Sequence, residues 1–272
     1  MFQSDELIYI QMQKTGCTHI ASLLSKLFNG EQIGKHNAAT DELMASGRYF
    51  ISSIRNPWDW YLSLWTYGVQ GNGGIRHRLI KRHIWRAVKT AAESPRKACV
   101  SALHELSKSA RSWRKVYDRS DNVASFRQWL KRIHDPRHSH SLGEGYGFTS
   151  VPRLGGFMTY RYLRLCCRNL GELSGGKSIV CPADLARFEN DNCYIDFFIR
   201  QESLEDDFCK AIEKVRPLTA EEKEFVYQAK KLNASQRSLT LSDYYDRESL
   251  ELVSHREELL IKKFNCAPPA IA

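Results

Sequence analysis

Two successive strand–turn–helix patterns in the first 70 residues constrain the fold more than any other feature of the chain. Residues 7–12 form a short apolar, β-prone run, and residues 17–28 carry apolar side chains at helical spacing. Residues 49–54 form a second such run, followed by a turn and a helical pattern that ends among glycines at 68–74. Alternating strands and helices predict a three-layer α/β fold, with a central, mostly parallel sheet flanked by helices.

The remaining pattern completes this picture. Residues 194–199 predict a third strand, residues 204–215 and 246–264 predict helices, and Thr219 with Glu222 has the spacing of a capping box. Residues 157–170 also favour a helix, whereas the Gly-, Pro- and His-rich residues 135–156 and the polar residues 232–242 predict loops. We expect one domain over residues 1–272, with a basic helical insertion at about 70–156.

The positive charge of the chain is concentrated in that insertion. The chain has 40 Lys and Arg against 31 Asp and Glu, a formal charge of +9. Residues 70–140 alone hold 17 basic and five acidic residues, together with six of the nine histidines. Such a segment indicates either a surface for nucleic acid or membrane, or a basic region beside the site of an acidic substrate.

The cysteines and the apolar runs indicate a reduced protein without a membrane anchor. The eight cysteines show no CxxC pair or spaced Cys/His quartet, so we expect free thiols and no zinc, with Cys166 and Cys167 acting as small buried apolar residues. No run of 18 apolar residues occurs, and the first residues carry acids where a signal peptide carries bases. We therefore expect a cytoplasmic protein with no transmembrane segment.

The first turn, Gln13-Lys14-Thr15-Gly16-Cys17-Thr18, has the composition of an anion-binding loop. It lies between a predicted strand and a predicted helix, where backbone N–H groups and the positive end of the helix are available. Lys14 adds a charge, the two threonines add hydroxyl groups, and Gly16 permits close approach of a ligand. The order of a Walker A loop is absent. The alternative is a capped turn with a surface lysine.

The second turn adds a guanidinium and a hydroxyl group. Arg55 follows a strand directly, and Ser63 stands eight residues later in the next helix, so both can face the carboxyl edge of the sheet. Such a pair suits a second phosphate. Taken singly, Arg55 could form a structural ion pair and Ser63 could be a small packing residue.

In order and spacing, the two turns resemble the nucleotide-binding segments of sulfotransferases that use 3′-phosphoadenosine 5′-phosphosulfate (PAPS). IQMQKTGCTHIASLL is similar to the 5′-phosphosulfate loop of carbohydrate members, and ISSIRNPWDWYLSLWTYG to their 3′-phosphate segment. Residues 199–207 resemble an Arg-x-Glu-x-Leu-x-x-Asp segment of the family, and the end of the chain resembles its carboxyl end. The likeness covers about residues 7–69 and 194–264 and implies a P-loop-like fold.

The resemblance implies specific roles for residues of this chain. Lys14 would stabilise the bridging oxygen of the leaving phosphate, and Arg55 with Ser63 would hold the 3′-phosphate. Gln13 replaces a common proline, and Trp60 replaces a frequent arginine, whose contact Arg237 or a basic residue of the insertion could supply. The 5′-phosphate would be held by the loop residues Thr15, Gly16, Cys17, Thr18 and His19.

An acceptor hydroxyl needs a base, and His36, between the two turns, is the candidate that the resemblance favours. His19 and the histidines at 134, 138 and 140 are weaker candidates. The spacing of these last three could also suit a metal, although a solvated loop is the simpler interpretation. No metal is required for sulfuryl transfer.

The chain is thus expected to transfer a sulfuryl group from PAPS to a hydroxyl group of a carbohydrate, either acidic or extended. The alternative is a protein that binds nucleic acid or another polyanion through residues 75–133, although no specific nucleic-acid motif occurs there. A P-loop kinase would need a Walker lysine that the chain lacks. The aromatic residues between 58 and 67 could stack on a ligand or form core.

Overall fold

The structure, a computed structural model, describes residues 1–85, 94–174, 178–230 and 239–271. The chain divides into two compact units. The sheet unit comprises Met1–Asn56, Arg161–Leu170 and Ala186–Ala234. The helical unit comprises Pro57–Tyr160, Gly171–Leu185 and Ser235–Ala272.

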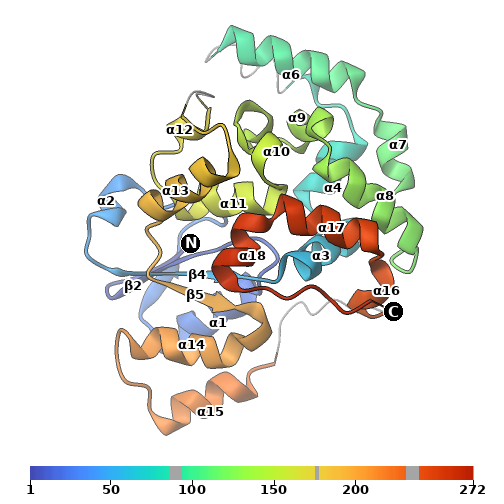
Figure 1. Cartoon of the computed structure of the whole chain (residues 1–272). Coiled ribbons are helices and arrows are strands. Elements are labelled where there is room, and N and C mark those ends of the chain that lie inside the picture. Colours follow the sequence, from blue (N-terminus) through green and yellow to red (C-terminus); the bar gives the residue numbers. More distant parts are fainter. Residues whose placement is uncertain (86–93, 175–177, 231–238, 272) are drawn as a thin grey trace. The chain divides into compact units, whose positions relative to one another are not determined.

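A five-stranded mixed sheet forms the centre of the sheet unit (Figure 1). Its order is β3-β1-β2-β4-β5; β1 pairs antiparallel with both β2 and β3, whereas β2, β4 and β5 run parallel. The strands are β1 (Phe2–Ser4), β2 (Leu7–Ile10), β3 (Gly30–Gln32), β4 (Tyr49–Ile54) and β5 (Phe197–Arg200).

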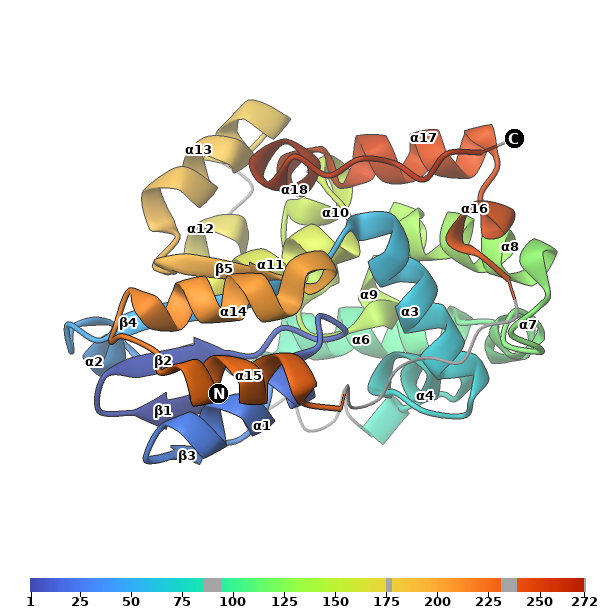
Figure 2. The same cartoon turned by 90° about the horizontal axis from the view of Figure 1, so that it is seen from below.

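Apolar side chains on both faces explain the central strands. All four residues of β2 are buried, as are the last five of β4, which is the pattern of a strand covered by helices on both sides. Leu7, Tyr9 and Ile51 belong to a core shared with α1 (Cys17–Leu27), α14 (Leu204–Glu213) and α15 (Ala220–Gln228). Figure 2 shows these three helices over one face of the sheet.

The other face of the sheet is covered by the carboxyl-terminal parts of α11 (Phe157–Cys166) and α13 (Pro182–Asn192), which begin in the helical unit. The Cys166 thiol donates to the Ser52 hydroxyl of β4 at 3.7 Å, and Tyr162 lies 5.6 Å from Phe198 of β5 between ring centroids. Helices therefore cover both faces of the sheet. The short α2 (Asp41–Met44) precedes β4, and η3 (Gln201–Ser203) follows β5.

The described part of the helical unit contains helices and no strand (Figure 1). Its core is aromatic: Trp65 packs on Phe126 at 5.4 Å between centroids and donates its indole N–H to the Val116 carbonyl at 2.7 Å. Its elements are α3 (Pro57–Val69), α4 (Gly74–Ile80), α6 (Pro95–Ser107), α7 (Ala110–Lys115), α8 (Val123–His134), η1 (Pro136–His138), α9 (Ser139–Leu142), η2 (Tyr146–Phe148), α10 (Val151–Leu154), α12 (Gly171–Ser174), α16 (Leu241–Tyr244), α17 (Arg247–Arg256) and α18 (Glu258–Phe264).

A buried carboxylate organises the end of the helical unit. Glu257 accepts hydrogen bonds from the Tyr61 hydroxyl, from the Thr159 hydroxyl at 2.6 Å, and from the backbone N–H groups of Thr159 at 2.9 Å and Met158 at 3.2 Å. Burial raises the pKa of this carboxyl group. A carboxylate suits the positive start of α11, where these N–H groups lie.

Several sequence-based expectations are confirmed and several are wrong. The α/β fold, β4, α1, α3 and the Thr219 capping box are as predicted. The sheet is mixed rather than mostly parallel. The sequence did not predict the strands β1 and β3, because each has only three residues and β3 is fully exposed, so neither gave an apolar signal. The third predicted strand begins at Phe197 rather than 194. The expected loop at 135–156 forms short helical turns, and the closing helix breaks at Glu257.

The expectation of one domain with an inserted basic segment stays a prediction. Among the described residues, no helix combines the length and the apolar character that crossing a membrane requires.

A substitution at Gly156 tests how much the buried Glu257 carboxylate and its hydrogen bonds contribute to the stability of the fold. A Cβ at this position would overlap the Glu257 carboxylate and approach the Tyr61 hydroxyl at 2.9 Å. We expect Gly156→Ala to lower the free energy of unfolding by about 2 kcal/mol or more, because a filled site must move apart to admit a methyl group. Denaturant unfolding measures this change.

Gly74→Ala is the matched control. No atom lies within 4 Å of a Cβ built at Gly74, and this residue begins α4. Alanine there should leave stability unchanged or raise it by up to about 1 kcal/mol. Equal losses in the two variants would contradict the role assigned to Glu257.

Candidate functional site

Three loops meet at one edge of the sheet. β2, β4 and β5 are parallel neighbours, with Ile10 paired to Ser52 and Ile54 paired to Arg200, so their carboxyl ends point the same way. They are followed by residues 11–16, by Arg55-Asn56 and by η3. This edge is where ligands of open α/β sheets bind.

The loop after β2 has the backbone of an anion-binding turn. Lys14 (φ 65°) and Gly16 (φ 80°) both lie in the left-handed region, which gathers N–H groups on one side of a turn. Gly16 caps α1, and the first turn of that helix, Cys17-Thr18-His19-Ile20, has no acidic side chain to meet the helix dipole. A positive helix end beside a lysine suits an anionic ligand.

Side chains inside this loop anchor it to the sheet. The Thr15 hydroxyl is 0% exposed, donates to the Met12 carbonyl at 2.8 Å, and lies 2.6 Å from the Ser53 hydroxyl of β4, which in turn contacts the Tyr9 hydroxyl at 2.6 Å. The Thr15 hydroxyl is therefore committed to contacts within the fold and is not available to a ligand. The sequence suggested both threonine hydroxyls as ligand donors.

Two further loop residues are also packed inward. Burial raises the pKa of the Cys17 thiol, although Lys35 and Lys14 oppose the shift, so this thiol is neutral at pH 7. His19 is buried on α1. Thr18 is half-buried, and its hydroxyl accepts from the Lys35 ammonium at 3.1 Å, which brings a second cation to the start of α1.

The loops after β4 and β5 brace the first loop. The Arg55 guanidinium donates to the Lys14 carbonyl at 3.2 Å. The Glu202 carboxylate of η3 accepts from the Asn56 N–H at 2.6 Å, and a Cβ at Gly16 would lie 2.9 Å from Leu204. In the sequence, residues 199–207 were identified only by their resemblance to a family segment. Their contacts with the other two loops join segments about 145–190 residues apart, so no local sequence pattern predicts them.

His36 lies beside the loop, in a fixed tautomer. Its Nδ1 is 2.9 Å from the Gln11 carbonyl, which can only accept, so Nδ1 carries the proton and Nε2 keeps its lone pair. Burial lowers the pKa of His36, and the positive charges of Lys35 and Arg161 lower it further. The ring is thus neutral at pH 7. Buried Arg161 is a contributor that the sequence did not reveal.

The sheet unit therefore holds most of the proposed site residues together. Lys14, Thr15, Gly16, Cys17, Thr18, His19 and Arg55 lie at its carboxyl edge or on α1, and His36 is hydrogen-bonded to the loop. Ser63 is buried on α3, which belongs to the helical unit. Arg237 lies outside the described residues.

The three loop histidines of the helical unit do not converge on a metal site. His134 is buried against Tyr61, His138 contacts Trp113, and His140 stacks on His104 at 4.1 Å between ring centroids. Burial lowers the pKa of each of the three. The aromatic run of α3 is core apart from Tyr67, which is 40% exposed.

Comparison with known proteins gives no relative: no protein-family model matches this chain, and no curated protein or solved structure does.

The inward position of Thr15 can be tested by removing its hydroxyl group. Thr15→Val keeps the shape but leaves the Ser53 hydroxyl with one partner fewer, so we expect a loss of about 1–3 kcal/mol in the free energy of unfolding. Thr18→Val, which removes a bond to an exposed lysine, should change stability by less than about 0.5 kcal/mol. A reversed order in thermal or denaturant unfolding would show that Thr15 is not the anchor.

Proposed function

We propose that this chain is a PAPS-dependent sulfotransferase that acts on a hydroxyl group of a carbohydrate. The observation that supports the proposal is the start of α1, where a left-handed lysine and a left-handed glycine cap precede a helix turn without acids, an arrangement that suits an anionic ligand. The sequence resemblance supplies the identity of that anion, a 5′-phosphosulfate. The finer fold assignment, P-loop-like, belongs to the same proposal.

Each residue of the proposed site has its own role in binding the nucleotide or in sulfuryl transfer. The N–H groups at the start of α1 bind the 5′-phosphate, and Lys14 stabilises the negative charge that builds on its bridging oxygen as the sulfuryl group leaves. Arg55 binds the 3′-phosphate while bracing the Lys14 carbonyl. Ser63 and Arg237 complete the 3′-phosphate contacts in this proposal. Transfer is in line, so positioning supplies most of the catalysis.

His36 supplies the base. The Gln11 carbonyl holds the proton on Nδ1, so Nε2 accepts the proton of the acceptor hydroxyl as its oxygen bonds to sulfur. A carboxylate or carbonyl partner on the far nitrogen is the usual way to orient a catalytic imidazole. The lowered pKa of His36 keeps the base form populated at neutral pH.

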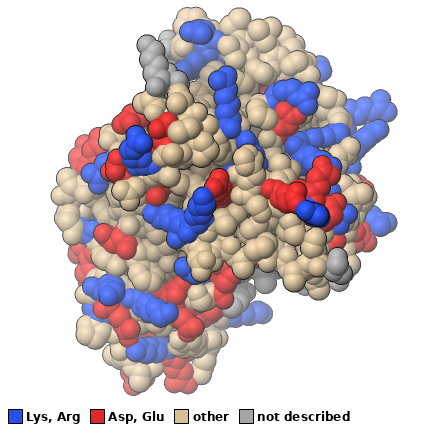
Figure 3. Space-filling model, viewed as in Figure 1, with Lys and Arg blue, Asp and Glu red and all other residues tan. Residues whose placement is uncertain are grey.

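The helical unit bears on the choice of acceptor. Several of its arginines bind backbone carbonyls, as Arg132 does with Ser112 at 2.9 Å and Arg114 with Ile80 at 3.3 Å, so part of the basic excess is structural. On the face seen in Figure 3, Lys and Arg gather over α7 and α8, whereas they alternate with Asp and Glu over α14 and α15. Exposed cations such as Arg96, Lys97 and Arg111 favour an acidic or extended glycan.

Lys14→Ala is the direct test of the anion site. With wild-type protein, we expect calorimetric titration with 3′-phosphoadenosine 5′-phosphate to show saturable binding and PAPS assays on a glycan panel to show sulfuryl transfer. Lys14→Ala should slow transfer by about a hundredfold or more, because a charge on the developing oxyanion is lost. Lys26→Ala, an exposed lysine at the other end of α1, should leave both unchanged.

Two results would refute the proposed function. One is folded wild-type protein that gives no binding heat at high micromolar nucleotide. The other is undiminished transfer by Lys14→Ala.

The pH dependence of transfer tests His36. A base must be deprotonated, and the pKa of this imidazole lies below its usual value of 6.5, so the rate should be constant near pH 7 and fall only as the pH drops through that lowered pKa. His36→Gln should lose most of the rate and the acid limb with it. An unchanged acid limb in His36→Gln would remove His36 from the mechanism. His255→Gln, at an exposed histidine of α17, is the comparison and should keep the acid limb.

A further inference from the structure

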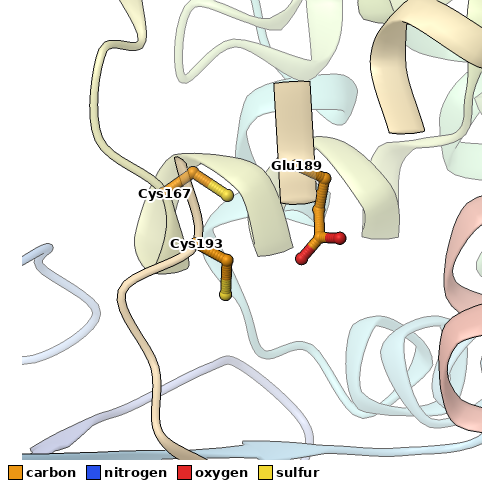
Figure 4. Close-up of side chains that lie close together, drawn as sticks. All are labelled: Cys167, Glu189 and Cys193. Carbon is orange, nitrogen blue, oxygen red and sulfur yellow. The ribbon is translucent and has the colours of Figure 1, made fainter. Parts of the chain in front are cut away.

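Two cysteines and a glutamate come together where α11 and α13 end. Cys167 follows α11, Glu189 lies on the last turns of α13, and Cys193 follows α13 (Figure 4). Their two sulfur atoms and a carboxylate oxygen all lie within 4.8 Å of one another. Among the residues that the structure describes, this is the one such group of three His, Cys, Asp or Glu side chains.

The backbone holds the two cysteines opposite each other. Cys167 and Cys193 form an isolated antiparallel bridge, flanked by hydrogen bonds from Arg168 N–H to the Asn192 carbonyl and from Tyr194 N–H to the Cys166 carbonyl, both at 3.0 Å. This is a non-hydrogen-bonded pair, the kind in which opposing side chains lie closest. The proximity of the thiols is therefore set by main-chain bonds on both sides.

Glu189 is positioned by its helix and by a tyrosine. It stands four residues before Cys193, so both side chains project from the same side of the helix end. Its side chain is 5% exposed, and its carboxylate accepts from the Tyr162 hydroxyl at 2.5 Å. The same hydroxyl lies 3.5 Å from the Cys193 sulfur. Such outer contacts are what orient the ligands of a metal ion.

We propose that Cys167, Glu189 and Cys193 bind a zinc ion. Two thiolates with one carboxylate suit zinc in type, since zinc takes Cys and Glu ligands in tetrahedral sites. Small side-chain rotations bring ligand atoms spaced by up to 4.8 Å to the distances that a shared ion needs. Three protein ligands leave the fourth position to water, within reach of Tyr162.

The ion would stabilise the sheet unit rather than take part in sulfuryl transfer. The residues next to the cysteines contact β4: the Cys166 thiol reaches the Ser52 hydroxyl, and Tyr194 packs on Phe50 at 5.3 Å between ring centroids. Zinc would join two segments 26 residues apart that cover this face of the sheet. The inference does not rest on the proposed function.

Metal binding by the full chain tests the proposal. The protein is prepared with a reductant that does not bind metal, stripped with a chelator, and titrated with Zn²⁺ in competition with a chromophoric chelator. We expect one zinc per chain by elemental analysis and a higher melting temperature with zinc. Co²⁺ should give thiolate charge-transfer and tetrahedral d–d absorption bands.

Variants assign the ligands. Cys167→Ser and Cys193→Ser should each weaken zinc binding about a hundredfold and reduce the charge-transfer band, and Glu189→Gln should weaken binding about tenfold while leaving that band. Cys209→Ser, another buried cysteine of the sheet unit, should bind as the wild type does. Tyr162→Phe removes the hydroxyl group that contacts both Glu189 and the Cys193 sulfur; it serves if a cysteine variant does not fold, and should weaken binding about tenfold.

Three results would overturn the proposal. The first is reduced, folded wild-type protein that binds no zinc, and the second is wild-type affinity in folded Cys167→Ser or Cys193→Ser. The third is a Cys167–Cys193 disulfide, identified by peptide mapping, in protein that takes up no zinc after reduction.

Discussion

The parallel pairing of β2, β4 and β5 is the constraint on which the candidate site depends. Because the strands run in the same direction and in register, the loops that follow them emerge at one edge. Their residues are then close enough to stabilise one another: Arg55 binds the backbone of the first loop, and Glu202 binds that of the second. An anion at this edge would meet a loop held from two sides, so little ordering would be needed on binding.

A held loop also explains the unusual backbone of Lys14. A non-glycine residue in the left-handed region costs about 1 kcal/mol and persists only where its surroundings fix it. Here the surroundings are the buried Thr15 hydroxyl, anchored to Ser53 of the next strand, and the Arg55 bond to the Lys14 carbonyl. Strain of this kind is common at functional sites, and at this site it is borne by the residue with the central proposed role.

The basic character of the chain has more than one physical meaning. In the helical unit, arginines that bind backbone carbonyls contribute to the fold, and exposed lysines and arginines leave a positive field at the surface. In the sheet unit, Lys14, Lys35 and Arg161 act at short range and shift the pKa of Cys17 or His36. Net charge alone does not separate these roles, because it counts buried, bonded and exposed cations equally.

The sequence by itself determined the local elements: β4 and α1 follow from apolar periodicity, the Thr219 cap from spacing, and the turn that holds Lys14 and Gly16 from its place between a strand and a helix. It could not reveal β1 and β3, which are too short or too exposed to leave a pattern. Only the tertiary structure decided that Thr15 points inward, that Glu202 braces a loop, and that Cys167 meets Cys193. The physical reason is that periodicity records which side of an element is buried, whereas these contacts join residues far apart in the chain and depend on how the strands pair.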